Sequence, residues 1–229
     1  MAKERILEYN QVYVWELPLR LIHWTNFACV VVLLATGFII GDPPALMSSS
    51  EASFQYWFGR VRFIHFLVAY VYLLVFVARV YWGFVGNEFV RWRNFLPLTK
   101  AKWREMKKVF CLDVFMICKL PVESTGANSL AAVIYSAVFL VMLFQIVSGF
   151  ALYSAMSQSW FPRLFAWITP LFGGEAALRQ WHHLASWAFI LFLMGHIYLS
   201  FYHDYIEGRG TMSSIIGGWK FIEKRDRPA

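Results

Sequence analysis

Hydrophobic side chains fall into four long runs along the chain, separated by segments rich in charged residues, proline and glycine. The runs cover residues 19–41, 63–85, 130–153 and 181–202. A bilayer core needs about 20 consecutive apolar residues in a helix, so each run is long enough to cross a membrane. The pattern predicts an all-α integral membrane protein, a four-transmembrane-helix bundle that forms one membrane domain over residues 1–229.

The segments between the runs predict two further helices at the membrane surface. The longest connection, residues 86–126, is a basic loop, and within it residues 100–119 mix Lys, Arg and Glu with apolar side chains such as Trp103 and Phe110. This mixture favours an amphipathic helix on an anionic leaflet; a solvated charged loop is the alternative. Apolar residues also recur at helical spacing over residues 160–168, which predicts a second interfacial helix.

Composition and charge agree with a membrane protein. The chain is 59% hydrophobic and 15% charged, and its net charge is +7. Because the basic residues lie between the apolar runs, a nucleic-acid partner is not expected. With the N-terminus inside, 17 of the 21 Lys and Arg residues fall on the inner side. The positive-inside rule then predicts an N-in/C-in, multi-pass protein of the bacterial inner membrane, with residues 86–126 in the cytoplasm.

The histidines carry the clearest chemical signal. All six lie in or at the edge of the apolar runs: His23, His65, His182, His183, His196 and His203. An ionisable group inside a bilayer is a functional-site candidate, although a neutral histidine bonded to a neighbouring helix is the alternative. The three cysteines form no C-x-x-C pattern, which argues against an iron–sulfur cluster, structural zinc or c-type haem. Any cofactor is therefore expected to bind histidine.

Helical geometry sorts four histidines into two pairs. His196 lies 14 residues after His182, about 21 Å further along a helix and within about 40° of the same direction. One helix thus offers two ligands at two depths. In the predicted topology, His65 matches the depth of His182, and His23 matches that of His196. We predict two haem b sites, His65 with His182 and His23 with His196.

The other two histidines have different predicted roles. His183 lies on another face of the helix, about 140° from His196, and is predicted to sit behind a ligand or to contact a haem propionate. His203 is seven residues past His196, and is either an alternative ligand or a proton-handling group at a quinone pocket.

Arginine and glycine residues accompany the proposed ligands. Arg20, Arg62 and Arg179 each stand three residues before a ligand, on the same helix face. They are either propionate-binding residues, since Arg binds carboxylates in a bidentate manner, or ordinary interfacial cations. Three glycines lie inside the runs, where they either admit a flat macrocycle or allow close helix packing: Gly37, Gly149 and Gly195.

Several motifs resemble the b-type cytochrome subunit of membrane-bound nickel–iron hydrogenases, over nearly the whole chain. They are R-L-I-H-W at 20–24 with T-G at 36–37, R-F-I-H at 62–65, R-V-Y-W-G-F-V-G-N at 79–87, G-F-A-L-Y at 149–153 and R-Q-W-H-H-L-x-x-W at 179–187 with F-x-x-x-H at 192–196. Thr25 and Gln180 depart from the family pattern, and His183 fits a position that the family fills with Arg or His.

The resemblance implies a respiratory electron-transfer function. Such subunits anchor the hydrogenase large and small subunits at the periplasmic face, accept electrons from an iron–sulfur cluster of the small subunit and reduce membrane quinone through two haems. His65 and His182 would hold the proximal haem, His23 and His196 the distal one, and residues 160–172 would dock the small subunit. The chain has no nickel-ligand cysteine pairs, so hydrogen splitting would belong to its partners.

Quinone-site residues are predicted only by their depth near the cytoplasmic end. The candidates are Arg79, Tyr81, Asn87, Tyr198, Tyr202 and His203. Three other functions remain open: a di-haem anchor of a formate dehydrogenase or thiosulfate-type reductase, a transporter or proton relay without haem, and a structural anchor with vestigial histidines.

Overall fold

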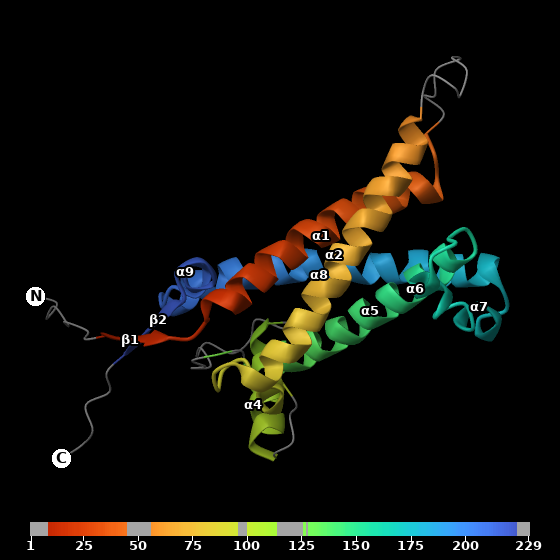
Figure 1. Ribbon diagram of the computed structural model, residues 1–229. Helices are drawn as coiled ribbons and strands as arrows, with labels where there is room; N and C mark the ends of the chain where they lie inside the picture. The colour runs from red at the N-terminus through yellow and green to blue at the C-terminus, as the bar shows by residue number, and fades with distance from the viewer. Residues whose placement is uncertain (1–8, 45–55, 96–99, 114–125, 127, 224–229) are drawn as a thin grey trace, which may run out of the picture. The chain divides into compact units, whose positions relative to one another are not determined.

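The computed structural model describes residues 9–44, 56–95, 100–113, 126 and 128–223 (Figure 1). Its long elements are four helices, α1 (Leu17–Gly41), α2 (Trp57–Val85), α5 (Ser129–Ser154) and α8 (Glu175–Glu207). Each is long and apolar enough to cross a membrane, with a mean hydropathy of 1.7 to 2.5 over its most apolar 18 residues. The predicted helical membrane fold is confirmed.

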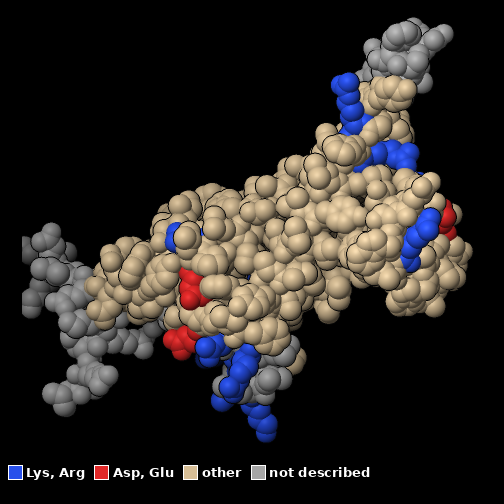
Figure 2. Space-filling model, in the orientation of Figure 1, with Lys and Arg blue, Asp and Glu red and all other residues tan. Residues whose placement is uncertain are grey.

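The long helices extend beyond the apolar runs, most of all α8, which begins six residues before the predicted start. Their outward faces are apolar: Leu74, Leu140 and Leu191 are each about two-thirds exposed. On the face shown in Figure 2, charged side chains are rare along these helices, whereas Lys and Arg gather over α4 (Lys100–Asp113). An apolar surface of this kind suits contact with lipid. The helical backbone suits it as well, because a helix satisfies its own backbone hydrogen bonds.

The described residues form two compact units. The first comprises the described residues within 22–80 and 137–193, which are most of the four long helices with the loop between α5 and α8. The second comprises the described residues within 1–21, 81–136 and 194–229, which include both ends of the described chain. Each unit is described separately below.

An aromatic cluster forms the core of the first unit. Phe150 on α5 lies 5.0 Å from the ring of Tyr70, 5.2 Å from that of Phe161 and 5.6 Å from that of Phe165. Phe161 and Phe165 come from the loop after α5, so this loop is anchored by aromatic packing rather than by hydrogen bonds alone.

The predicted interfacial helix over residues 160–168 is instead two short helices, α6 (Trp160–Arg163) and α7 (Ile168–Leu171). Turn-type backbone bonds join them, such as Phe165 N–H to the Pro162 carbonyl, 2.9 Å. Ile168 packs with Ala151 and Leu178. Proline lacks the N–H that helices need, so the two prolines of this segment favour short turns over one continuous helix.

In the second unit, the chain ends pair as a two-stranded antiparallel sheet. Strand β1 (Tyr9–Tyr13) lies beside β2 (Trp219–Glu223), with Tyr13 opposite Trp219. Gly218 precedes β2 with a φ of 92°, a conformation that glycine adopts without strain. Its carbonyl accepts the N–H groups of Val14 and Trp15. This pairing was not predicted from the sequence.

Glu16 links the start of α1 to the end of α2 within the second unit. Its carboxylate accepts hydrogen bonds from Trp82 Nε1 (2.9 Å) and from the backbone N–H of Asn87 (3.0 Å). The Asn87 side chain in turn donates to the Val14 carbonyl at 2.9 Å. These bonds give the W-G-F-V-G-N segment a structural role.

Shorter helices complete the second unit: α3 (Trp92–Phe95), α4 and α9 (Thr211–Gly217). The predicted helix over residues 100–119 is confirmed as far as Asp113, and residues 114–119 lie outside the described chain. Glu105 of α4 accepts hydrogen bonds from the N–H and hydroxyl of Ser129, at 3.2 and 2.7 Å, and so caps the start of α5.

Candidate functional site

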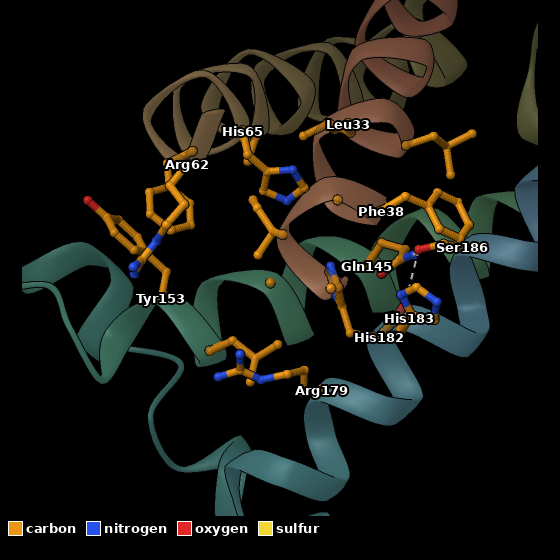
Figure 3. A pocket seen from close by; sticks show the side chains of 18 of the residues that line it. Leu33, Phe38, Arg62, His65, Gln145, Tyr153, Arg179, His182, His183 and Ser186 are labelled. Carbon is orange, nitrogen blue, oxygen red and sulfur yellow. Dashed lines mark hydrogen bonds between the residues drawn. The ribbon is translucent and has the colours of Figure 1, made fainter. Parts of the chain in front are cut away.

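A cavity of about 430 Å³ lies among α1, α2, α5 and α8 of the first unit. This volume is within the usual range for cofactor sites, about 300–1,000 Å³. The lining is mostly apolar and aromatic, but it includes three histidines and two arginines that the sequence singled out: His65, His182, His183, Arg62 and Arg179. Figure 3 shows the imidazole rings of His65 and His182 pointing into this cavity from α2 and α8.

The Thr36 hydroxyl on α1 determines which nitrogen of His65 faces the cavity. This hydroxyl lies 2.6 Å from the Val32 carbonyl, to which it donates, and 2.8 Å from Nδ1 of His65. A hydroxyl has one proton, so its oxygen can only accept from the imidazole. Nδ1 of His65 therefore carries the proton, and Nε2 keeps the lone pair that a metal requires.

Ser148 on α5 likewise determines which nitrogen of His182 carries the proton. Its hydroxyl donates to the Phe144 carbonyl at 2.6 Å and lies 2.7 Å from Nδ1 of His182. The Ser148 side chain is completely buried, so no solvent competes for these bonds. The same hydrogen-bond argument leaves the Nε2 lone pair of His182 available.

Two glycines provide space for these rings. A Cβ added at Gly37 would lie 3.4 Å from Cε1 of His65, and one at Gly149 would lie 3.2 Å from Cε1 of His182. The second distance is shorter than the carbon–carbon optimum of about 3.5–4.0 Å. In the described structure, both glycines make room for these histidine rings. At Gly195 an added Cβ meets no described atom within 4 Å.

A short chain of hydrogen bonds holds α8 against α5 beside His182. Gln145 Nε2 donates to the Ser186 hydroxyl at 3.0 Å, and that hydroxyl donates to the His182 carbonyl at 3.2 Å. Gln145 and Ser186 both line the cavity. The backbone as well as the ring of His182 is therefore fixed.

Two buried polar atoms from cavity-lining residues have no hydrogen-bond partner among the described residues: the Tyr72 hydroxyl and Gln145 Oε1. An unsatisfied buried polar group costs about 1–3 kcal/mol. A ligand bound in the cavity is expected to form hydrogen bonds with such atoms. The two atoms without a described partner are therefore consistent with a cavity that binds a ligand.

The cavity's donor set fits a haem. Two neutral imidazoles can supply the two axial ligands of a haem iron, and the predominantly apolar lining suits a macrocycle. Arg62 and Arg179 add guanidinium groups that can bind carboxylates. Arg62 also lies near the sulfur of Met156, at 2.7 Å from NH2, and over the ring of Phe66 at 6.0 Å.

His183 occupies a separate part of the lining. Its ring packs at 5.0 Å against Phe38, nearly perpendicular to it, and a Cβ at Gly41 would lie 3.3 Å from its Nδ1. Contact with α1 agrees with the predicted role away from the iron, which stays a prediction.

The other predicted ligand pair is divided between the units. His23 belongs to the first unit, where its ring lies 5.2 Å from that of Trp24, and it is not part of the cavity lining. His196 belongs to the second unit, 5.8 Å from the ring of Tyr135. Arg20, in the second unit, donates to the Ile216 carbonyl. The pairing of His23 with His196 stays a prediction.

The quinone candidates are placed as follows. Tyr198 and Tyr202 stack on α8 with ring centroids 5.9 Å apart, and His203 Nδ1 lies 3.2 Å from a carboxylate oxygen of Glu207. Tyr81 is largely exposed. Asn87 makes the structural bond to Val14 already described, and Arg79, in the first unit, is mostly buried. No described cavity joins these six residues.

The sequence reasoning missed the hydroxyl partners Thr36 and Ser148. A signal was present, because each directly precedes one of the intrahelical glycines. The hydroxyls nevertheless look like ordinary helix-backbone donors until the neighbouring helix is in place.

Comparisons with known proteins identify the family of this chain. The family model described as prokaryotic cytochrome b561 matches residues 14–218. The probable Ni/Fe-hydrogenase B-type cytochrome subunit of Azotobacter vinelandii is 39% identical over 231 residues, covering 99% of this chain and 95% of the relative. The protein of the same name in Cupriavidus necator is 35% identical, covering 91% and 86%. The probable Ni/Fe-hydrogenase 1 B-type cytochrome subunit of Escherichia coli is 32% identical, covering 91% and 90%.

These relatives confirm the resemblance seen in the motifs. The family match covers most of the chain, including all the proposed ligands and both hydroxyl partners. The protein is a multi-pass membrane protein that belongs to the prokaryotic cytochrome b561 family.

Proposed function

We propose that this chain is the di-haem b cytochrome subunit of a membrane-bound nickel–iron hydrogenase. It accepts electrons from an iron–sulfur cluster of the hydrogenase small subunit and transfers them to membrane quinone. The observation that carries the proposal is the pair His65 and His182, whose rings enter one cavity with Nδ1 bonded to a hydroxyl. The names of the relatives supply the donor complex.

His65 and His182 would hold the proximal haem through Nε2. A bound haem b supplies an iron that gains and loses one electron. The chain's own residues hold the two lone pairs in place and surround the site with apolar side chains that keep water away. Arg62 and Arg179 bind the propionates, and His183 assists them from the same lining.

His23 and His196 would hold the distal haem, with Arg20 nearby in the sequence. Helix α8 contains both His182 and His196, and 14 residues of helix rise about 21 Å. One helix would then supply a ligand to each haem.

The two ends of the bundle have different partners in this proposal. At the periplasmic end, α6 and α7 expose Trp160, Leu164, Trp167 and Leu171, which offer an apolar docking surface for the small subunit. At the cytoplasmic end, quinone binds near Tyr198, Tyr202 and His203 on α8, with Arg79, Tyr81 and Asn87 as further candidates. The positive charges of α4 keep this end in the cytoplasm.

The test uses bacterial inner membranes that contain the whole hydrogenase complex. An anaerobic absorbance difference spectrum is recorded after hydrogen and again on the same sample after dithionite, which reduces all b haem. We expect hydrogen to reduce much of the b haem, and deletion of this chain to abolish that reduction. His65→Ala should lose the proximal haem and quinone reduction, while hydrogen still reduces an artificial soluble dye.

Ser154→Ala is the control, because Ser154 also lies on a membrane helix but does not line the cavity. It should retain both haems. If dithionite reveals chain-dependent b haem that hydrogen does not reduce, the donor is a formate dehydrogenase or thiosulfate-type reductase. If no chain-dependent haem is found, the haem assignment is wrong and a transporter or proton relay becomes the better interpretation.

A further inference from the structure

The same three-part arrangement occurs twice around the cavity. On α1 the adjacent residues Thr36 and Gly37 face His65 of α2, and on α5 the adjacent residues Ser148 and Gly149 face His182 of α8. In each case the hydroxyl reaches Nδ1, while the glycine leaves space for Cε1 of the same ring. The pair α1 and α2 thus presents an imidazole in the same way as the pair α5 and α8, although no sequence repeat relates the two pairs.

The hydrogen bonds have a fixed direction in both copies. Each hydroxyl proton is committed to a carbonyl one turn earlier, Val32 for Thr36 and Phe144 for Ser148, both at 2.6 Å. The hydroxyl oxygen then accepts the Nδ1 proton at 2.8 or 2.7 Å. Imidazoles that donate from Nδ1 to an acceptor are oriented by it and become stronger ligands through Nε2.

An ordinary helix hydroxyl lacks this second bond to an imidazole. Ser154, also on α5, donates to the Ala151 carbonyl at 2.6 Å, and it does not line the cavity. Donation to a preceding carbonyl is common for Ser and Thr in helices. What distinguishes Thr36 and Ser148 is that each oxygen accepts from a histidine on the next membrane helix.

We propose that Thr36 and Ser148 are positioning residues that hold the proton on Nδ1 of His65 and His182, aim both Nε2 atoms at one iron and lower its midpoint potential. This inference rests on the proposed function, because it requires a haem between the two histidines. The hydroxyls act through the ligands and need not touch the haem themselves.

The direction of the effect follows from ligand strength. A stronger imidazole donor stabilises the ferric more than the ferrous state, because the ferric iron carries the extra positive charge. Loss of a partner behind a metal ligand typically weakens metal binding 10- to 100-fold. If one lost hydroxyl weakens the ferric state about tenfold more than the ferrous state, the midpoint potential rises by about 59 mV, since the couple transfers one electron.

The experiment compares four single variants in membranes that contain the whole complex. Thr36→Val removes the hydroxyl and keeps the branched shape, whereas Thr36→Ser keeps the hydroxyl. Ser148→Ala removes the second hydroxyl, and Ser154→Ala removes a hydroxyl of the same helix that has no imidazole partner in the described structure. Measurements are the haem content by pyridine haemochrome, a redox titration of the b band, and the electron paramagnetic resonance spectrum of the oxidised haems.

We expect Thr36→Val and Ser148→Ala to affect the same haem, the one held by His65 and His182. Each variant should raise the midpoint potential of that haem and change its electron paramagnetic resonance spectrum. Thr36→Ser and Ser154→Ala should match the wild type. If Thr36→Val loses this haem altogether while Thr36→Ser keeps it at its original potential, the hydroxyl is again shown to be needed.

Two results would overturn the inference. One is a haem whose potential and spectrum are unchanged in both Thr36→Val and Ser148→Ala. The other is an equal change of midpoint potential in Thr36→Ser and Thr36→Val, since side-chain packing rather than the hydroxyl would then be responsible. Failure of the proposed function is a distinct outcome, because the wild-type membranes themselves would then lack chain-dependent b haem.

Discussion

Replacing Gly149 by alanine tests whether the glycine beside His182 exists to make room for the ligand ring. The added Cβ would lie 3.2 Å from Cε1 of His182, at least about 0.3 Å inside the carbon–carbon optimum. The ring cannot rotate away freely, because Nδ1 is bonded to Ser148 at 2.7 Å on the same turn of α5. We therefore expect His182 to shift and its Nε2 to move out of alignment.

The magnitude follows from the steric contact. Overpacking a well-filled site costs about 1–3 kcal/mol, whereas the higher helix propensity of alanine acts equally on the protein with and without haem. The loss in haem binding should therefore be about 1–3 kcal/mol, or about 5- to 150-fold in affinity. Transfer of haem from the detergent-solubilised protein to excess apomyoglobin measures this loss.

Two other glycines provide graded controls. Gly37→Ala brings its Cβ to 3.4 Å from Cε1 of His65, close to an ordinary contact, and Gly59→Ala on α2 meets, among the described atoms, only Cβ of Tyr56 at 4.0 Å. Haem should be lost most readily from Gly149→Ala, less from Gly37→Ala, and at the wild-type rate from Gly59→Ala. Equal retention in Gly149→Ala and Gly59→Ala would refute the steric argument.

Two further predictions concern the second unit. Glu16→Ala removes the acceptor for Trp82 Nε1 and the Asn87 N–H, and at about 1–3 kcal/mol for each group left unsatisfied it should lower the thermal unfolding midpoint. Circular dichroism of the detergent-solubilised protein would test this, and an unchanged midpoint would contradict the structural role of Glu16. Burial lowers the pKa of Lys220 on β2 below its ordinary value of 10.5, although Glu207 opposes the shift. Because the folded state then holds this proton less tightly than the unfolded state, stability should rise as pH rises from the lowered pKa towards 10.5. Lys220→Met should remove that slope in unfolding curves measured across this range, and an unaltered slope would show that another group titrates.

Sequence periodicity predicted the long helices well, because a bilayer requires long apolar runs and each run is unambiguous. It also placed His65 and His182 at a common depth, since helix rise and topology fix depth without knowledge of packing. The structure brings both into one cavity with Arg62 and Arg179. Those features depend on position along a helix, which the sequence contains directly.

Features that depend on contacts between distant segments were harder to predict from the sequence. The β1–β2 pair joins two five-residue strands from opposite ends of the chain, and segments so short carry little pattern of their own. For the intrahelical glycines, the sequence left a macrocycle and a second helix as alternatives, and the described neighbours of Gly37 and Gly149 are the rings of His65 and His182 on the adjacent helices. Only the packed helices show which hydroxyl and which glycine meet which histidine.

In the proposal, the shape of α8 matters more than that of the other long helices. In the proposal α8 carries a ligand for each haem, whereas α1 and α2 carry one ligand each. A bend between His182 and His196 would therefore misalign at least one site, while the same bend in α2 would affect only His65. Helix α8 contains no proline over its 33 residues, although proline is a common cause of sharp kinks. Next to His182, the Gln145–Ser186 hydrogen bond fastens α8 to α5. In the proposal, both redox sites therefore depend on the shape of α8, and the Thr36 and Ser148 hydroxyls act on one of these sites without altering α8 itself.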